Sequence, residues 1–147
     1  WDTKMVDGFT NYPDKILMAI PYDGKDKNKP KNLLDAKEPT LIGDVPFSSP
    51  HFLVHKNWIN TLGYLAPAFF WHWHVDTYTQ KVARKLNRCL FLPTVTFKAK
   101  KIINDNAGKQ IRKNLNIKHR DHFVWTKVRD RHLSADVDAL RTFIENY

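Results

Sequence analysis

The chain has 147 residues, of which 42% are hydrophobic and 27% charged, the composition of one globular domain with a substantial core. The 24 Lys and Arg residues outnumber the 15 Asp and Glu residues, a net charge of +9, which favours anionic partners such as nucleic acid, a membrane surface or phosphorylated small molecules. A single cysteine, Cys89, excludes an internal disulfide and is compatible with a reducing compartment. With no apolar run long enough to span a bilayer and no recognisable leader, we expect a cytoplasmic location.

The first third of the chain predicts short strands separated by irregular segments. Apolar or β-branched runs indicate strands at Lys15–Tyr22, at Thr40–Ile42 and, as an edge strand, at Phe52–Val54. The polar, Lys-rich segment Asp23–Glu38 and the Pro-containing segment Asp44–Pro50 predict loops. The sheet is therefore expected to be small.

The middle of the chain predicts two helices and one long strand. A short helix is expected over His55–Leu62, ended by a glycine at position 63. A second helix, capped by Asp76 or Thr77, is expected to run to about Leu86. The apolar segment Arg88–Lys98 then predicts a strand, and its proline at position 93 indicates an edge position or a bend.

The last third predicts helices. Three amphipathic pieces are marked by Ile111 and Leu115, by Phe123, Val124 and Val128, and by Leu133, Val137, Leu140 and Ile144. We therefore expect a single α/β domain over residues 1–147. Residues 1–104 would hold a small mixed sheet with its helices, and residues 105–147 a helical tail.

An isolated acidic residue is the strongest candidate for chemistry. Asp76 is the one carboxylate between Asp44 and Asp105, and it follows a cluster of aromatic and histidine residues at positions 69–74. At a helix start the dipole favours the ionised form, as a general base requires. The alternative is simple capping, because Asp is among the preferred N-cap residues.

The cluster before Asp76 suits a sugar-binding surface or a core. Aromatic faces stack on sugars, and Trp and His side chains donate hydrogen bonds to hydroxyl groups. We expect two of the three residues Phe69, Phe70 and Trp71 to be core, and Trp73 or His74 to be the better ligand contact. The spacing of His72, His74 and Asp76 could suit a metal, but no cysteine or fourth ligand lies nearby. We therefore predict no metal site and keep His72 and His74 as weak candidates.

Two segments carry a resemblance to a known family. They read HKNWINTLGYLAPAFF and HVDTYTQKVARKLNRCLFLP. Together with the order of elements from position 15 to position 147, they resemble the acceptor-side half of a nucleotide-sugar glycosyltransferase with the GT-A fold, close to family 2. The resemblance implies a partial GT-A-like, Rossmann-related sheet. It also implies transfer of a sugar to an acceptor hydroxyl, with Asp76 as general base.

Their position beside Asp76 makes Trp71, Trp73 and His74 candidate acceptor contacts, and Tyr64 is a fourth candidate. The resemblance also assigns donor-binding residues. It implies that Lys98, Lys100 and Lys101 hold the donor diphosphate, because the segment TVTFKAKK has lysines where many relatives place a metal-binding histidine. The alternative for these lysines is a solvated basic rim.

The family's aspartate-rich metal motif is expected upstream of the region that this sequence covers. Mg²⁺ or Mn²⁺ would then accompany the nucleotide-sugar donor only in the presence of an upstream half. We expect no cofactor for this chain alone, which would be a fragment inactive by itself.

Two further functions remain open on the sequence. The first is a basic module that binds single-stranded nucleic acid through its charge and exposed aromatic residues. The second is a structural or interaction domain that pairs its aromatic face with another chain.

Overall fold

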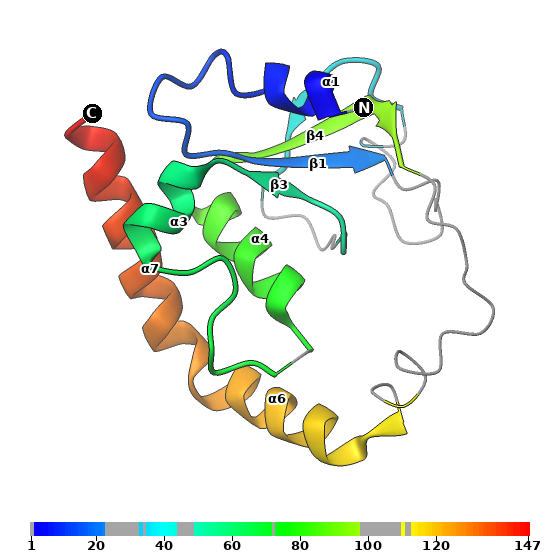
Figure 1. The fold of residues 1–147 in the computed structure, drawn as a ribbon, viewed down its shortest axis with the longest axis vertical. Helices are drawn as coiled ribbons and strands as arrows, with labels where there is room; N and C mark the ends of the chain where they lie inside the picture. Colours follow the sequence, from blue (N-terminus) through cyan, green and yellow to red (C-terminus); the bar gives the residue numbers. More distant parts are fainter. Residues whose placement is uncertain are drawn as a thin grey trace.

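The computed structural model describes residues 2–22, 33, 35–43, 49–71, 73–97, 110 and 113–147. These residues form a mixed α/β fold with a four-stranded sheet (Figure 1). The strands are β1 (Met18–Tyr22), β2 (Thr40–Leu41), β3 (Leu53–Val54) and β4 (Cys89–Thr96). The longer helices are α1 (Asp2–Asp7), α3 (Lys56–Leu62), α4 (Val75–Lys85), α6 (Leu115–Lys127) and α7 (Arg129–Glu145). The predicted α/β class is therefore confirmed.

The sheet has the order β2-β4-β1-β3. β1 and β4 are parallel, whereas β2 and β3 lie antiparallel at the two edges. The long segment between the parallel strands contains α3 and α4, as a parallel crossover requires. β4 is thus a central strand, which corrects the expectation of an edge position for Pro93. The alternative of a bend holds, because the register shifts between Pro21, opposite Leu92, and Tyr22, opposite Thr96.

Side chains alternate between the two faces of the central strands, as extended backbone dictates. On one face Met18, Ile20, Cys89 and Phe91 pack against a large core. On the other face Leu17, Ala19, Leu90 and Leu92 pack against α1. Figure 1 shows the same layers, with α1 on one side of the sheet and α3, α4 and α7 on the other. α1 has no counterpart among the elements that the sequence predicted.

The helical tail agrees with the prediction in its last element and differs in the one before. In α7, Leu133, Val137 and Leu140 are buried, as their spacing predicted. In α6, by contrast, Leu115 and Phe123 are each 61% exposed, although we expected both on apolar faces. The inner face of α6 buries the carboxylate of Asp121 instead. Ile111 lies outside the described residues.

α3 begins and ends as its sequence indicated. The His55 imidazole accepts a hydrogen bond from the N–H of Asn57, at 3.2 Å. Gly63 ends the helix in the left-handed conformation, with φ of 80°, where a residue without a Cβ is least strained. Trp58 is fully buried in the core beneath.

Candidate functional site

The start of α4 lies beside α6 rather than at the sheet. α4 leads into β4 through a short turn, and its first residues lie away from the strands and next to α6 (Figure 1). The stacking of His74 on Trp125 of α6 shows the same neighbourhood. Asp76, in the first turn of α4, is therefore placed between the sheet-facing part of α4 and α6.

The N-cap of α4 differs from the prediction. His74 occupies the cap with φ of 69° and makes no side-chain capping bond, and the helix begins at Val75. Asp76 is inside the first turn, where its Oδ1 accepts from the N–H of Thr77 at 2.8 Å. The preceding backbone is held by a distant residue rather than by a local cap, and this explains the departure. Asp76 is half-buried and remains near the positive end of the helix dipole.

Gln80, one turn further along α4, connects this helix to the segment that precedes β3. Residues four apart on a helix share a face, so Asp76 and Gln80 lie on the same side of α4. The buried Gln80 amide pairs with the backbone of Ser49. Its Nε2 donates to the carbonyl at 2.6 Å and its Oε1 accepts from the N–H at 3.2 Å. The chain from Ser49 onward is thereby tied to the helix that carries Asp76.

A small cavity lies just beyond Ser49. It has a volume of about 360 Å³ and is mostly apolar, with Pro21 from the end of β1 and the rings of His51 and Phe97 in its wall. The two rings lie 4.4 Å apart between centroids. Its volume is within the range of small-molecule sites. Asp76 does not line this cavity.

Two of the acceptor-binding candidates, Trp71 and Trp73, are held through their backbone by a buried carboxylate. The carboxylate of Asp121, on α6, accepts from the backbone N–H groups of Trp71, at 3.0 Å, and of Trp73, at 2.7 Å. It also forms an ion pair with Arg120 at 3.1 Å. Asp121 is fully buried. We refer to these contacts of Asp121 and Arg120 with residues 69–73 as the Asp121 clamp.

Arg120 completes the clamp. Its Nη1 donates to the carbonyl of Phe69 at 2.9 Å, and its guanidinium lies 3.9 Å from the centroid of the Trp71 ring. The Trp71 side chain is nevertheless 62% exposed. Phe70 is buried and Phe69 packs against the core, so two of these three aromatic residues are core, as predicted.

His74 packs against Trp125 of α6 rather than toward an open site. The two rings are stacked with centroids 4.9 Å apart, and the His122 ring lies 6.1 Å from His74. Burial, followed by the nearby His122, lowers the pKa of His74 below its ordinary value, against the opposing pull of Asp121 and Asp76. This imidazole is therefore held mainly neutral near pH 7.

Tyr64, the fourth acceptor candidate, belongs to a different cluster. Its hydroxyl donates to the carboxylate of Asp136 on α7, as does the hydroxyl of Tyr78 on α4, the latter at 2.7 Å. Burial and the Asp136 charge raise the pKa of both tyrosines. Tyr64 thus ties the residues after α3 to α7, whereas the backbone of Trp71 and Trp73 is held by Asp121 of α6.

Of the predicted diphosphate and metal ligands, His74 alone belongs to the part of the chain that the structure describes. Lys98, Lys100 and Lys101 lie outside the described residues, as does His72. Within the described ranges no group of three His, Cys, Asp or Glu side chains could hold a metal ion.

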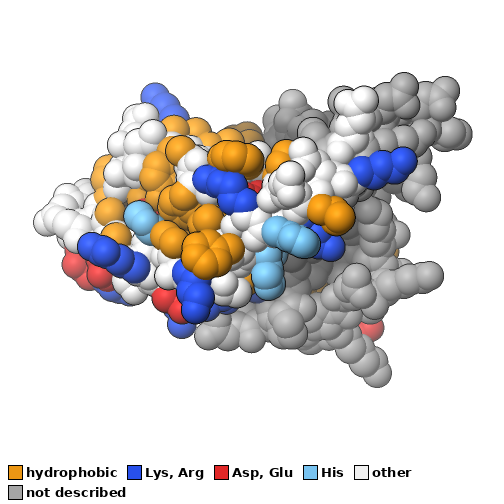
Figure 2. All heavy atoms as spheres, turned by 90° about the horizontal axis from the view of Figure 1, so that it is seen from below, with side chains coloured by type: hydrophobic (Ala, Val, Ile, Leu, Met, Phe, Trp, Pro, Cys, Tyr) orange, Lys and Arg blue, Asp and Glu red, His pale blue; other side chains and the backbone are white. Residues whose placement is uncertain are grey.

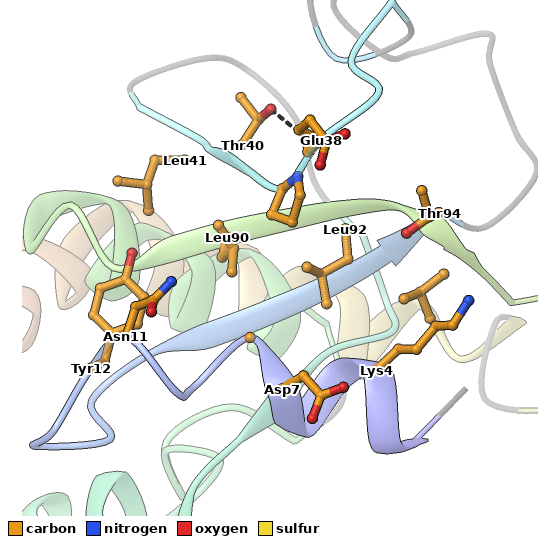
Figure 3. A pocket seen from close by; sticks show the side chains of 13 residues that line it. Lys4, Asp7, Asn11, Tyr12, Glu38, Thr40, Leu41, Leu90, Leu92 and Thr94 are labelled. Carbon is orange, nitrogen blue, oxygen red and sulfur yellow. Dashed lines mark hydrogen bonds between the residues drawn. The ribbon is translucent and has the colours of Figure 1, made fainter.

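A larger hollow lies on the opposite face of the sheet. It has a volume of about 730 Å³, with a floor formed by Leu90, Leu92 and Val95 and a polar rim. Figure 3 shows Lys4 and Asp7 of α1 on one side of it and Glu38 and Thr40 on the other. Sequence analysis missed this hollow, because its walls come from segments that carry no shared motif. Asp76 does not line it.

The clusters around Asp121 and Asp136 were also missed. Each carboxylate meets partners 48 to 72 residues away in the chain, and no local pattern signals such pairs. None of the described helices combines the length and the apolar character that a membrane crossing requires. No family model, curated protein or solved structure matches the chain.

Proposed function

We propose that this chain is the acceptor-side part of a GT-A-like glycosyltransferase, which transfers a sugar from a nucleotide donor to an acceptor hydroxyl. The observation that carries the proposal is the position of Asp76. It is a half-buried carboxylate in the first turn of α4, the helix that leads into β4, and its hydrogen bonds are with the adjacent Thr77. A carboxylate has more acceptor sites than these, so it can also accept from the hydroxyl group of a ligand.

Asp76 acts as general base in this proposal. As the acceptor oxygen forms its bond to the anomeric carbon, the bond from that carbon to the donor phosphate oxygen breaks and the diphosphate leaves. The hydroxyl proton passes to the Asp76 carboxylate, which needs to be ionised and fixed. Asp76 lies near the positive end of the α4 dipole, and the Asp121 clamp holds the segment that leads into α4.

The donor side of the proposal rests on the end of β4. Phe97 follows β4, and its N–H donates to the carbonyl of Tyr22 at 2.7 Å, which fixes the chain at the sheet edge. Lys98 is the next residue, so the proposed diphosphate ligands begin within one residue of this anchored position. The buried free thiol of Cys89 is compatible with the reducing, cytoplasmic location that the proposal includes.

The test is a donor-cleavage assay. A panel of nucleotide-diphosphate sugars is incubated with the 147-residue chain and with any longer product of its reading frame, and nucleoside diphosphate release is measured. The resemblance predicts turnover only for a longer form. Turnover by the 147-residue chain would therefore show that the predicted inactivity of the isolated chain is wrong. We expect Asp76→Asn to lower turnover by about 10²–10⁴-fold and the exposed control Asp138→Asn to leave it unchanged. No donor cleavage by any form, or full activity of Asp76→Asn, would refute the proposal.

A further inference from the structure

The outward face of α6 combines positive charge with an exposed aromatic ring. α6 has one acidic residue, Asp121, and that carboxylate is fully buried. The exposed residues of the helix include Lys118, His119, His122, Phe123 and Lys127. The solvent side of α6 therefore carries cationic and titratable groups and an exposed ring, with no carboxylate on the same helix to offset the charge.

Trp71 extends this surface beyond the helix. The Asp121 clamp fixes the Trp71 backbone to α6, and the Arg120 guanidinium covers its ring from 3.9 Å. The side chain is still 62% exposed, so a flat aromatic surface remains open to a ligand. Figure 2, seen from below Figure 1 and so from the side where α6 lies, shows blue and pale-blue side chains interleaved with orange ones.

We infer that the outward face of α6 and the ring of Trp71 bind an acidic glycan, which is the acceptor of the proposed transfer. The inference rests on the proposed function, because Trp71 lies five residues before Asp76 in the chain. An aromatic face contacts the apolar face of a sugar ring. Lys118 and Lys127 lie at opposite edges of the exposed half of α6, and they bind carboxylate or phosphate groups on different sugars of the polymer. The net charge of +9 attracts such a polymer over a longer range.

Two other polyanionic partners fit this face less well. Insertion into an anionic membrane requires a helix with a continuous apolar side. Here the polar residues Asn116, His119, His122 and Thr126 lie among the exposed positions of α6. Binding of single-stranded nucleic acid uses several aromatic rings on which successive bases stack. In the described part of the chain, this surface has two large exposed aromatic side chains, Trp71 and Phe123.

The binding test uses a labelled oligogalacturonate and its methyl ester, which has the same rings without the charges. We expect anisotropy to show binding of the acidic form, weakening as salt rises, and little binding of the ester. Trp71→Ala and the double variant Lys118→Gln/Lys127→Gln should each weaken binding about tenfold. The Trp71 change removes only the ring and keeps the N–H that Asp121 accepts from.

Matched controls separate this face from general charge. Lys37→Gln/Lys56→Gln removes two exposed lysines elsewhere, and Tyr147→Ala removes a ring that is 68% exposed at the end of the chain. Both should leave the dissociation constant within about twofold. Equal loss in the control pair, or equal binding of the ester, would overturn the inference.

Two competing ligands complete the design. Oligodeoxythymidine that binds as tightly and loses affinity equally in Trp71→Ala would make this a nucleic-acid surface and overturn the inference, as would binding to phosphatidylglycerol vesicles alone. Asp76→Asn should keep glycan binding while losing transfer. Glycan binding without donor cleavage by any form would refute the proposed function and leave a glycan-binding surface. Transfer to neutral acceptors alone would refute the inference and leave the transferase.

Discussion

Two carboxylates, those of Asp121 and Asp76, differ in their burial and in the number of hydrogen-bond partners that the fold provides. Asp121 is fully buried and accepts from the adjacent Arg120 and from two backbone N–H groups that are 48 and 50 residues away in the chain. Asp76 is half-buried, and its hydrogen bonds are with the adjacent Thr77. A buried charge with a full set of partners holds structure, whereas one with spare accepting capacity can take a proton from a ligand.

The difference separates a structural acid from a candidate catalytic one. The Asp121 clamp holds the chain only a few residues before Asp76, since it binds the backbone N–H groups of Trp71 and Trp73. Changes at Asp121 should therefore act on stability, and changes at Asp76 on turnover. The predictions that follow run from the largest expected effect to the smallest.

The largest effect should come from Asp121→Ala. The change leaves two backbone N–H groups and the Arg120 charge without their acceptor, and loss of one partner of a buried ion pair costs about 3–5 kcal/mol. Urea unfolding followed by far-UV circular dichroism measures it. The control Asp138→Ala removes an exposed acid paired with Arg141 and should cost less than about 1 kcal/mol. Equal losses in the two variants would remove the distinction drawn for Asp121.

The second effect concerns Tyr64 and Tyr78 at Asp136. Each hydroxyl donates to a buried carboxylate, so Tyr78→Phe should cost about 1–3 kcal/mol near neutral pH. Both tyrosine pKa values are raised in the fold, whereas the unfolded chain ionises near pH 10. The stabilisation that these two hydroxyl groups contribute is therefore present below about pH 10 and is lost as the pH rises above it.

The measurement is the melting temperature between about pH 9 and about pH 11. The double variant Tyr64→Phe/Tyr78→Phe should lose less stability over this range than the parent chain, because two of the shifted groups are gone. Tyr147→Phe, at an exposed position, serves as the control. An unchanged slope in the double variant would show that these hydroxyls do not carry the alkaline loss.

A smaller effect should appear at His74 in mild acid. Its pKa is lowered in the fold, so the folded state favours the neutral ring. Its contribution to stability is present above its unfolded pKa of about 6.5 and is lost as the pH falls below that value. His74→Asn, which tolerates the positive φ, should flatten the decline between about pH 7 and about pH 5. A decline as steep as in the parent chain would contradict this role.

The elements with a local signal could be predicted from the sequence. The spacing of Leu133, Val137 and Leu140 indicated α7, and Gly63 marked the end of α3. β1 and β4 followed from their apolar runs, and a bend at Pro93 followed from the missing N–H. Each of these depends on residues a few positions apart, which a sequence displays directly.

The features that depend on distant partners could not be predicted. Phe123 matched an apolar helix position, yet it is 61% exposed because the opposite side of α6 is used to bury Asp121. The cap of α4 falls on His74 because the clamp sets the direction of the chain before the helix. Asp76 was found because it is isolated in sequence, and the same reasoning could not find Asp121, which lies among basic residues and resembles an ordinary surface acid.

The most direct test measures stability and turnover together in Asp76→Asn. We expect the free energy of unfolding to change by less than about 1 kcal/mol, the size of a charge–dipole interaction at a helix start. Turnover per folded molecule should fall by about 10²–10⁴-fold in whichever form of the protein cleaves a nucleotide sugar. A variant that folds equally well and transfers sugar at the parental rate would contradict the role of Asp76 as general base.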